Sequence, residues 1–359
     1  MKAVGNGMRR LFIPLAALLI AAALSATASA GSLTAEDKRL TKAAFAQIEQ
    51  EHWAQAKDII ARAKNPLARK LIDWLDLRQA GPGRAFADYV AFLDANPAWP
   101  NRWTVRSQAE RAMPDDLPDA AILQFFDKHD PNTIEGVMRM AAALTAAGQT
   151  VRATALLRQG WVEMDFGDVD ETQFLALYRQ AIRPEDDARR LDRLLWEEKS
   201  DQARRLLPRV DEGHQALALA RLSLMAGAVT DAAVAKVPPE LLKDPGLIYD
   251  RARWHRRNGE YDKAVALLDP PPSAVARPEL FWRELEDAAR RALLRGDISV
   301  AYRLAEAHGA GDNANFYDGE WLAGWIALRF LQEKQAGYQH FTRLYDGVTS
   351  GLSKSRGAY

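Results

Sequence analysis

Beyond Gly31, apolar residues recur three or four positions apart, the spacing that places them on one face of an α-helix. Two clear examples are the runs Phe45, Ile48, Trp53, Ala56, Ile59, Ile60 and Leu191, Leu194, Leu195, Ala203. No run of four or more residues alternates β-branched and polar side chains as a half-buried strand does. The pattern therefore predicts an all-α protein.

Helix-breaking residues divide this pattern at short intervals. Proline removes an amide donor and restricts the residue before it, so each such site predicts a helix boundary. The sites are Asn65-Pro66, Gly81-Pro82-Gly83, Asn96-Pro97, Pro100, Asp130-Pro131, Pro184, Pro238-Pro239, Asp244-Pro245 and Pro270-Pro271-Pro272. We expect many helices of about 10–15 residues joined by short loops.

A repeated frame of glycine, alanine and leucine predicts helical hairpins. The glycine would end the first helix in a left-handed cap, the alanine would let the second helix approach closely, and the leucine would fill the groove. The copies are Gly148, Ala153, Leu156; Gly259, Ala264, Leu267; Gly296, Ala301, Leu304; a looser Gly227, Ala232, Ala235; and, without glycine, Ala203, Leu206 and Ala56, Ile59. Stacked hairpins of this kind form a tetratricopeptide-like α-superhelix or solenoid, which the recurring interval favours over a single globular bundle.

The first thirty residues have the layout of a secretory signal. Lys2, Arg9 and Arg10 precede an apolar run from 11 to 24, and Ala28-Ser29-Ala30 supplies a signal-peptidase site. Cleavage after Ala30 would leave the mature chain outside the cytoplasm, with no membrane segment left. We therefore predict a signal peptide at 1–30, an α-superhelical domain at 31–348, and the truncated start of a next helical element at 349–359.

Composition excludes several classes of function. Lys+Arg and Asp+Glu are equal at 48 each, so the chain lacks the cationic surplus of a non-specific nucleic-acid binder. The absence of cysteine excludes disulfides, thiolate metal sites, iron–sulfur clusters and thiol catalysis. Apolar residues at 48% argue against a disordered chain.

The sequence indicates no catalytic residue, no cofactor site and no metal site. Phosphate-loop, nucleophile-elbow and His-Glu-x-x-His motifs are missing. The histidines do not share a helical spacing and are interpreted as surface or interhelix side chains: His52, His129, His214, His255, His308 and His340. Two acidic clusters, Asp115-Asp116 and Glu185-Asp186-Asp187, are interpreted as helix caps. The arginine-rich runs at 251–257 and 283–295 are interpreted as solvated helix faces.

Ten tryptophans are expected to fill mainly the spaces between helices. An exposed tryptophan could instead stack on a sugar ring.

Several segments, in order, resemble the N-terminal superhelical domain of soluble lytic transglycosylases, periplasmic enzymes that cut peptidoglycan glycan strands. They are Phe86–Pro100, Ala109–Ala112, Arg189–Trp196, Ala203–Pro208, Asp244–Trp254 continuing to Gly259, Glu320–Leu331 with His340 and Phe341, and Ser353–Tyr359. The sequence departs from these relatives at Thr349-Ser350-Gly351, where they usually carry a proline.

The resemblance implies a ring or horseshoe of helices that guides glycan to a separate catalytic domain. That domain carries a glutamate in a Glu-Ser motif and cleaves the bond between N-acetylmuramic acid and N-acetylglucosamine to give a 1,6-anhydro product. The present chain has no Glu-Ser pair, so no catalytic residue is carried over. Two hypotheses follow: the non-catalytic part of a lytic transglycosylase, or a stand-alone periplasmic α-solenoid adaptor that binds proteins or envelope components.

Overall fold

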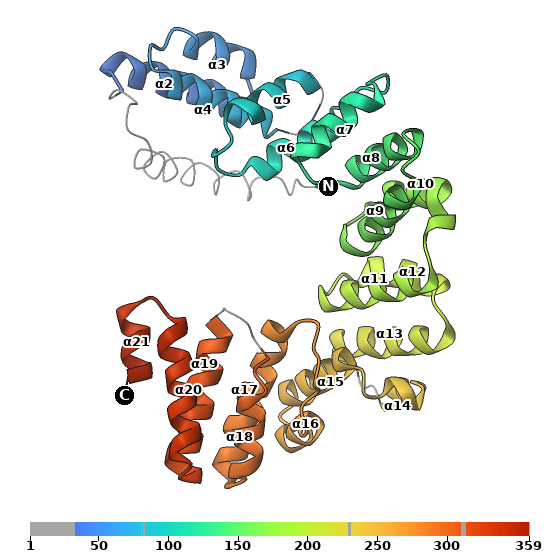
Figure 1. Cartoon of the computed structure of the whole chain (residues 1–359), viewed down its shortest axis with the longest axis vertical. Helices are drawn as coiled ribbons and strands as arrows, with labels where there is room; N and C mark the ends of the chain where they lie inside the picture. Colours follow the sequence, from blue (N-terminus) through green and yellow to red (C-terminus); the bar gives the residue numbers. More distant parts are fainter. Residues whose placement is uncertain (1–32, 80, 82, 229–230, 310–313, 359) are drawn as a thin grey trace, which may run out of the picture. The chain divides into compact units, whose positions relative to one another are not determined.

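The computed structural model describes residues 33–79, 81, 83–228, 231–309 and 314–358, and in this part of the chain it forms α-helices and no β-strand (Figure 1). The prediction of an all-helical, solenoid-like fold is confirmed. The predicted signal peptide lies outside the described residues. Among the described residues, none of the helices combines the length and apolar character needed to span a lipid bilayer.

The chain divides into two compact units, Met1–Ala153 and Thr154–Tyr359. Unit 1 contains α2 (Ala35–Ile48), α3 (Trp53–Ile60), α4 (Pro66–Leu77), α5 (Phe86–Ala95), α6 (Arg102–Arg111), α7 (Asp119–Lys128), α8 (Ile134–Ala146) and the first residues of α9 (Thr150–Glu163). Helices α2, α4, α6 and α8 contact one another in succession, and α3, α5 and α7 connect them.

Unit 2 is also built of helical hairpins. Its helices are α10 (Asp168–Tyr178), α11 (Pro184–Trp196), α12 (Ser200–Leu206), α13 (Glu212–Met225), α14 (Asp231–Val234), α15 (Pro245–Arg257), α16 (Tyr261–Leu268), α17 (Pro278–Arg295), α18 (Ile298–Glu306), α19 (Ala314–Ile326), α20 (Lys334–Gly347) and α21 (Gly351–Ala358). Short 3₁₀ turns lie at η1 (Arg179–Ala181), η2 (Leu207–Arg209) and η3 (Pro239–Leu241), and a π-helical turn, η4 (Ala327–Leu331), follows α19. The first helices of successive hairpins, α11, α13, α15, α17 and α19, contact their neighbours in that order (Figure 1).

Proline and its capping residue set several helix starts, as the sequence predicts. Helix α4 begins at Pro66, and the Asn65 side chain accepts a hydrogen bond from the Leu67 amide at 2.9 Å. Helix α15 begins at Pro245, and the Asp244 carboxylate accepts one from the Leu247 amide at 2.8 Å. A proline at the first helical position loses no hydrogen bond, because that amide has no partner inside the helix.

The glycine frame ends helices in the left-handed conformation, also as predicted. The φ angles are 76° at Gly148, 76° at Gly227, 77° at Gly259 and 87° at Gly296. In three other turns a larger residue stands in the place of the glycine and has the same left-handed conformation. The φ angles are 63° at Glu51, 56° at Glu198 and 61° at Gln332. Each of these residues stands five positions before a small residue of the next helix. The conformation, rather than the glycine, is the repeated feature.

The small residue of the frame is buried as expected, but the leucine prediction is partly wrong. Ala56, Ala203 and Ala301 are fully buried. Leu206 and Leu304 are also buried, whereas Leu156, Leu267 and Ile59 are only half-buried, and the next residue along fills the groove instead. Those residues are Leu157, Leu268 and Ile60. A residue four positions after the alanine lies on the same helix face, so a small rotation of the helix exchanges the two positions. For the looser copy, the prediction that its small residue is buried is wrong, because Ala232 is exposed on the four-residue helix α14.

Buried polar side chains connect the helices within each unit. In unit 1 the Glu110 carboxylate of α6 accepts hydrogen bonds from the Thr133 amide and hydroxyl, both at 2.7 Å, at the start of α8. In unit 2 the Arg221 guanidinium of α13 donates to Asp250 of α15 at 2.7 Å and to Asp192 of α11 at 2.8 Å. Gly246 makes room for Arg221, because a Cβ there would lie 2.2 Å from the guanidinium.

We predict that exchanging residues at the left-handed positions changes stability in opposite directions. Gly296→Ala should lower the free energy of unfolding by about 1–2 kcal/mol, the usual penalty of a side chain in this conformation. A Cβ at Gly296 meets no atom within 4 Å, so the loss would come from backbone strain alone. Gln332→Gly should raise the free energy of unfolding by about 0.5 kcal/mol, because relief of strain exceeds the added freedom of the unfolded chain.

Urea unfolding followed by circular dichroism measures both changes. A Gly296→Ala variant as stable as the parent chain would show that the left-handed turn imposes no strain.

Candidate functional site

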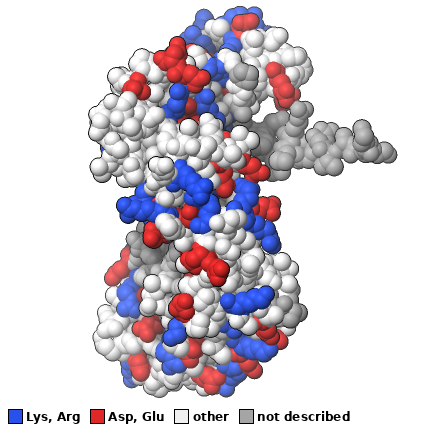
Figure 2. Space-filling model, turned by 90° about the vertical axis from the view of Figure 1, so that its right-hand side faces the viewer, with Lys and Arg blue, Asp and Glu red and all other residues white. Residues whose placement is uncertain are grey.

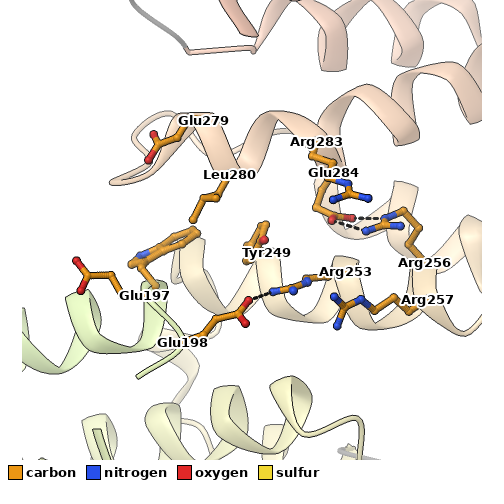
Figure 3. Close-up of a pocket in the computed structure, with 11 residues that line it drawn as sticks. Glu197, Glu198, Tyr249, Arg253, Arg256, Arg257, Glu279, Leu280, Arg283 and Glu284 are labelled. Atoms are coloured by element: carbon orange, nitrogen blue, oxygen red, sulfur yellow. Dashed lines mark hydrogen bonds and ion pairs between the residues drawn. The ribbon is translucent and has the colours of Figure 1, made fainter. Parts of the chain in front are cut away.

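A pocket of about 450 Å³ opens in unit 2 between the end of α11, one face of α15 and the start of α17 (Figure 3). Tyr249, Arg253 and Arg256 come from α15 at positions four and three apart, so they share one helix face. Leu280, Arg283 and Glu284 share a face of α17 in the same way. Trp196 ends α11, and Glu197, Glu198, Arg257 and Glu279 complete the lining.

The floor of the pocket is aromatic but offers little ring surface. The Trp196 and Tyr249 rings lie 5.1 Å apart between centroids, tilted by 38°. They are only 5% and 9% exposed, whereas Leu280 at the rim is 38% exposed. Burial raises the pKa of the Tyr249 phenol, so the hydroxyl stays neutral. A ligand would meet ring edges and Leu280 here, and not an open indole face.

Two ion pairs form the walls. Arg256 donates two hydrogen bonds to the Glu284 carboxylate, at 2.7 and 2.9 Å, joining α15 to α17 (Figure 3). Arg253 pairs with Glu198, which follows α11 and has left-handed backbone. These carboxylates are engaged by guanidinium groups, so neither is presented to a ligand as a general acid or base.

Two further arginines, Arg257 and Arg283, line the pocket without such a partner. Both are exposed, and neither forms an ion pair within the described part of the chain. The interpretation of the arginine-rich runs as solvated faces is therefore incomplete. The contact between α15 and α17 brings the two runs together around one pocket, and the repeat frame was the signal in the sequence that could have indicated this.

The buried histidines gather at a second place, around Glu320 of α19. Glu320 Oε2 lies 2.6 Å from His340 Nδ1, and Glu320 Oε1 lies 3.2 Å from His308 Nε2 and accepts a hydrogen bond from Arg343 Nε at 2.8 Å. His340 Nε2 also lies 3.0 Å from the Tyr302 hydroxyl. The sequence left open whether each histidine is a surface or an interhelix side chain. His308 and His340 are of the interhelix kind, and the sequence did not indicate the carboxylate that they share.

The environment of Glu320 fixes its charge. Burial opposes ionisation, but the hydrogen bonds from His308, His340 and Arg343 outweigh it and hold the pKa of Glu320 well below its ordinary range. A carboxyl in that state cannot donate a proton near neutral pH, so Glu320 is not available as a general acid. Within the described residues, no group of three or more histidine, aspartate or glutamate side chains could hold a metal ion.

Of the two acidic clusters predicted to cap helices, the structure confirms one. Glu185, Asp186 and Asp187 lie in the first turn of α11, as predicted. The prediction for Asp115-Asp116 is wrong, because both lie in the turn before α7 and Asp119 takes the first-turn position. A turn at 115–116 and the N-cap Pro118 separate them from the helix, because a proline disfavours the helical conformation of the residue before it.

Most tryptophans fill spaces between helices, as expected, and Trp74, Trp161, Trp196 and Trp282 are buried. Trp103 of α6 in unit 1 differs, with 63% of its surface exposed.

On the face shown in Figure 2, basic and acidic side chains are interspersed, as the equal numbers of both charges suggest.

We predict that Glu320→Gln lowers the free energy of unfolding at pH 7 by about 3–5 kcal/mol, the usual cost of breaking a buried ion pair. The pKa of Glu320 is depressed in the folded state, so its contribution is fully present above the unfolded pKa of about 4.3 and is lost as pH falls below it. The stability of the parent chain should therefore fall more steeply between pH 5 and pH 3 than that of Glu320→Gln. Urea unfolding across this pH range tests the difference, and parallel curves would contradict the assignment.

A comparison of the chain with models of protein families, with curated proteins and with solved structures finds no match. A proposal for its function therefore depends on the sequence features, the fold and the geometry of the sites.

Proposed function

We propose that the chain is a periplasmic, non-catalytic helical-repeat module that binds the glycan strands of peptidoglycan. In this proposal it forms the superhelical part of a lytic transglycosylase and positions glycan for a separate catalytic domain. The ordered segments that resemble this family and the signal-like leader support the proposal, and the stacked hairpins are compatible with it.

The observation that carries the proposal is the pocket of unit 2. It is an open site with Leu280 as the main exposed apolar group, and two arginines of its lining have no ion-pair partner among the described residues. Sugar polymers of the cell wall combine apolar ring faces with acidic groups. A pocket of about 450 Å³ is within the usual range for sites that hold a small ligand.

Trp103 of unit 1 provides independent support. Its neighbours Arg102 and Arg106 donate hydrogen bonds to neutral groups: Arg102 to the Pro97 carbonyl at 3.0 Å, and Arg106 to the Asn132 side chain at 2.9 Å. An exposed indole on a helix that also carries two arginines suits a sugar ring that carries an acidic substituent.

We predict that the purified mature chain sediments with peptidoglycan sacculi, and that Trp103→Ala weakens this binding about fivefold, or about 1 kcal/mol for the loss of one stacked ring. Leu294→Ala is the matched control, because Leu294 is another exposed apolar side chain, 81% exposed on α17. Both variants should melt like the parent chain. Failure of the parent chain to bind sacculi would refute the proposal, and capture of an envelope protein in its place would favour the adaptor hypothesis.

We also predict that the chain alone releases no 1,6-anhydro muropeptides from sacculi. Glu198 and Glu284 in the pocket are engaged in ion pairs, and Glu320 is buried and ionised. Mass spectrometry of the soluble products measures release, with an active lytic transglycosylase as the positive control. Detection of anhydro products would show that a catalytic carboxyl is present in the chain.

A further inference from the structure

We infer that the pocket between α11, α15 and α17 selects its ligand by a carboxylate, which Arg257 and Arg283 bind. The inference builds on the proposed binding of peptidoglycan and names the chemical group that the pocket recognises. The source of the carboxylate is either the lactyl group of the sugar or the peptide attached to it.

The lining holds four arginines and four glutamates, and cations outside the lining pair with two of the glutamates, so two arginines of the lining are in surplus. Arg253 neutralises Glu198, and Arg256 neutralises Glu284. Glu197 accepts hydrogen bonds from three cations that do not line the pocket, namely Arg193 at 2.7 Å, Lys199 at 2.7 Å and Arg277 at 2.8 Å. Glu279 lies 3.7 Å from Arg277. Every carboxylate of the lining therefore has a basic partner.

Arg257 and Arg283 supply that surplus. Arg257 is the last residue of α15, and Arg283 lies in the second turn of α17, so two neighbouring helices each contribute one guanidinium (Figure 3). A guanidinium presents a planar set of N–H donors that matches the two oxygens of a carboxylate. Both side chains are exposed, so they can reorient toward a ligand without breaking an existing ion pair.

The apolar lining cannot provide selection by itself. The rings of Trp196 and Tyr249 are largely buried, and Leu280 is the main apolar group at the rim. Burying one such aliphatic side chain stabilises the complex with any sugar, whether or not the sugar carries a charge. Discrimination between ligands of the same shape must therefore come from charge.

Titration calorimetry with the mature chain tests the inference using three probes. The first is a peptide-free tetrasaccharide of alternating N-acetylglucosamine and N-acetylmuramic acid, which carries lactyl carboxylates. The second is chitotetraose, which has a similar backbone and no carboxylate. The third is the free stem peptide, which has carboxylates and no sugar.

We expect the tetrasaccharide or the peptide to bind at least tenfold more tightly than chitotetraose. The double variant Arg257→Ala/Arg283→Ala should remove this difference. Arg204→Ala/Arg290→Ala is the matched control, since both residues are exposed, lie outside the pocket and give the same change of net charge. Thermal melting verifies that each variant is folded.

The outcomes separate this inference from the proposed function. Preference for the tetrasaccharide assigns the carboxylate to the sugar, and preference for the peptide assigns it to the stem. Equal binding of chitotetraose, or an unchanged Arg257→Ala/Arg283→Ala variant, overturns the inference while sacculus binding still supports the proposed function. If a probe binds through its carboxylate but the chain does not bind sacculi, the inference is supported and the proposed function is overturned. No binding of any probe overturns the inference.

Discussion

A charged side chain buried between helices must find its partner on a neighbouring helix, and this requirement holds the hairpins of each unit together. Arg190 of α11 is fully buried, and its guanidinium donates to the Trp161 carbonyl at 2.6 Å and the Met164 carbonyl at 2.8 Å near the end of α9. The guanidinium also lies 4.5 Å from the centroid of the Trp161 ring, and burial lowers the pKa of Arg190 to about 10. Because an unpaired buried charge is far more costly than a buried apolar group, each such contact fixes how two helices align.

The same kind of contact shapes the pocket of unit 2. The bidentate pair of Arg256 and Glu284 sets the alignment of α15 with α17, and the pair of Arg253 and Glu198 connects α15 to the turn after α11. Once those groups are satisfied, Arg257 and Arg283 are the cations of the lining that stay available to a ligand. The interactions that stabilise the stack and the proposed recognition of an acidic glycan therefore come from one set of helix faces.

The repeat illustrates how far the sequence predicts the fold. Glycine is a direct sign of left-handed backbone, so the turns at Gly148, Gly259 and Gly296 were predictable. Glu198 and Gln332 adopt the same conformation without that sign, because the packing of the following helix imposes it at the cost of some strain. The exchange of Leu267 for Leu268 as the buried residue has a similar origin. Side chains at both positions face the same groove, and the exact rotation of the helix decides which one enters.

The sequence alone determined the helical class, the places where prolines begin helices and the hairpin repeat, since these depend on contacts within a few residues. It also contained the arginines of 251–257 and 283–295, without indicating which of them would be paired. Only the tertiary structure decided that Arg253 and Arg256 meet glutamates while Arg257 and Arg283, within the described residues, do not. It also decided that His308 and His340 share Glu320. The physical reason is that pairing energies depend on distances between side chains from different helices, and helix packing sets those distances.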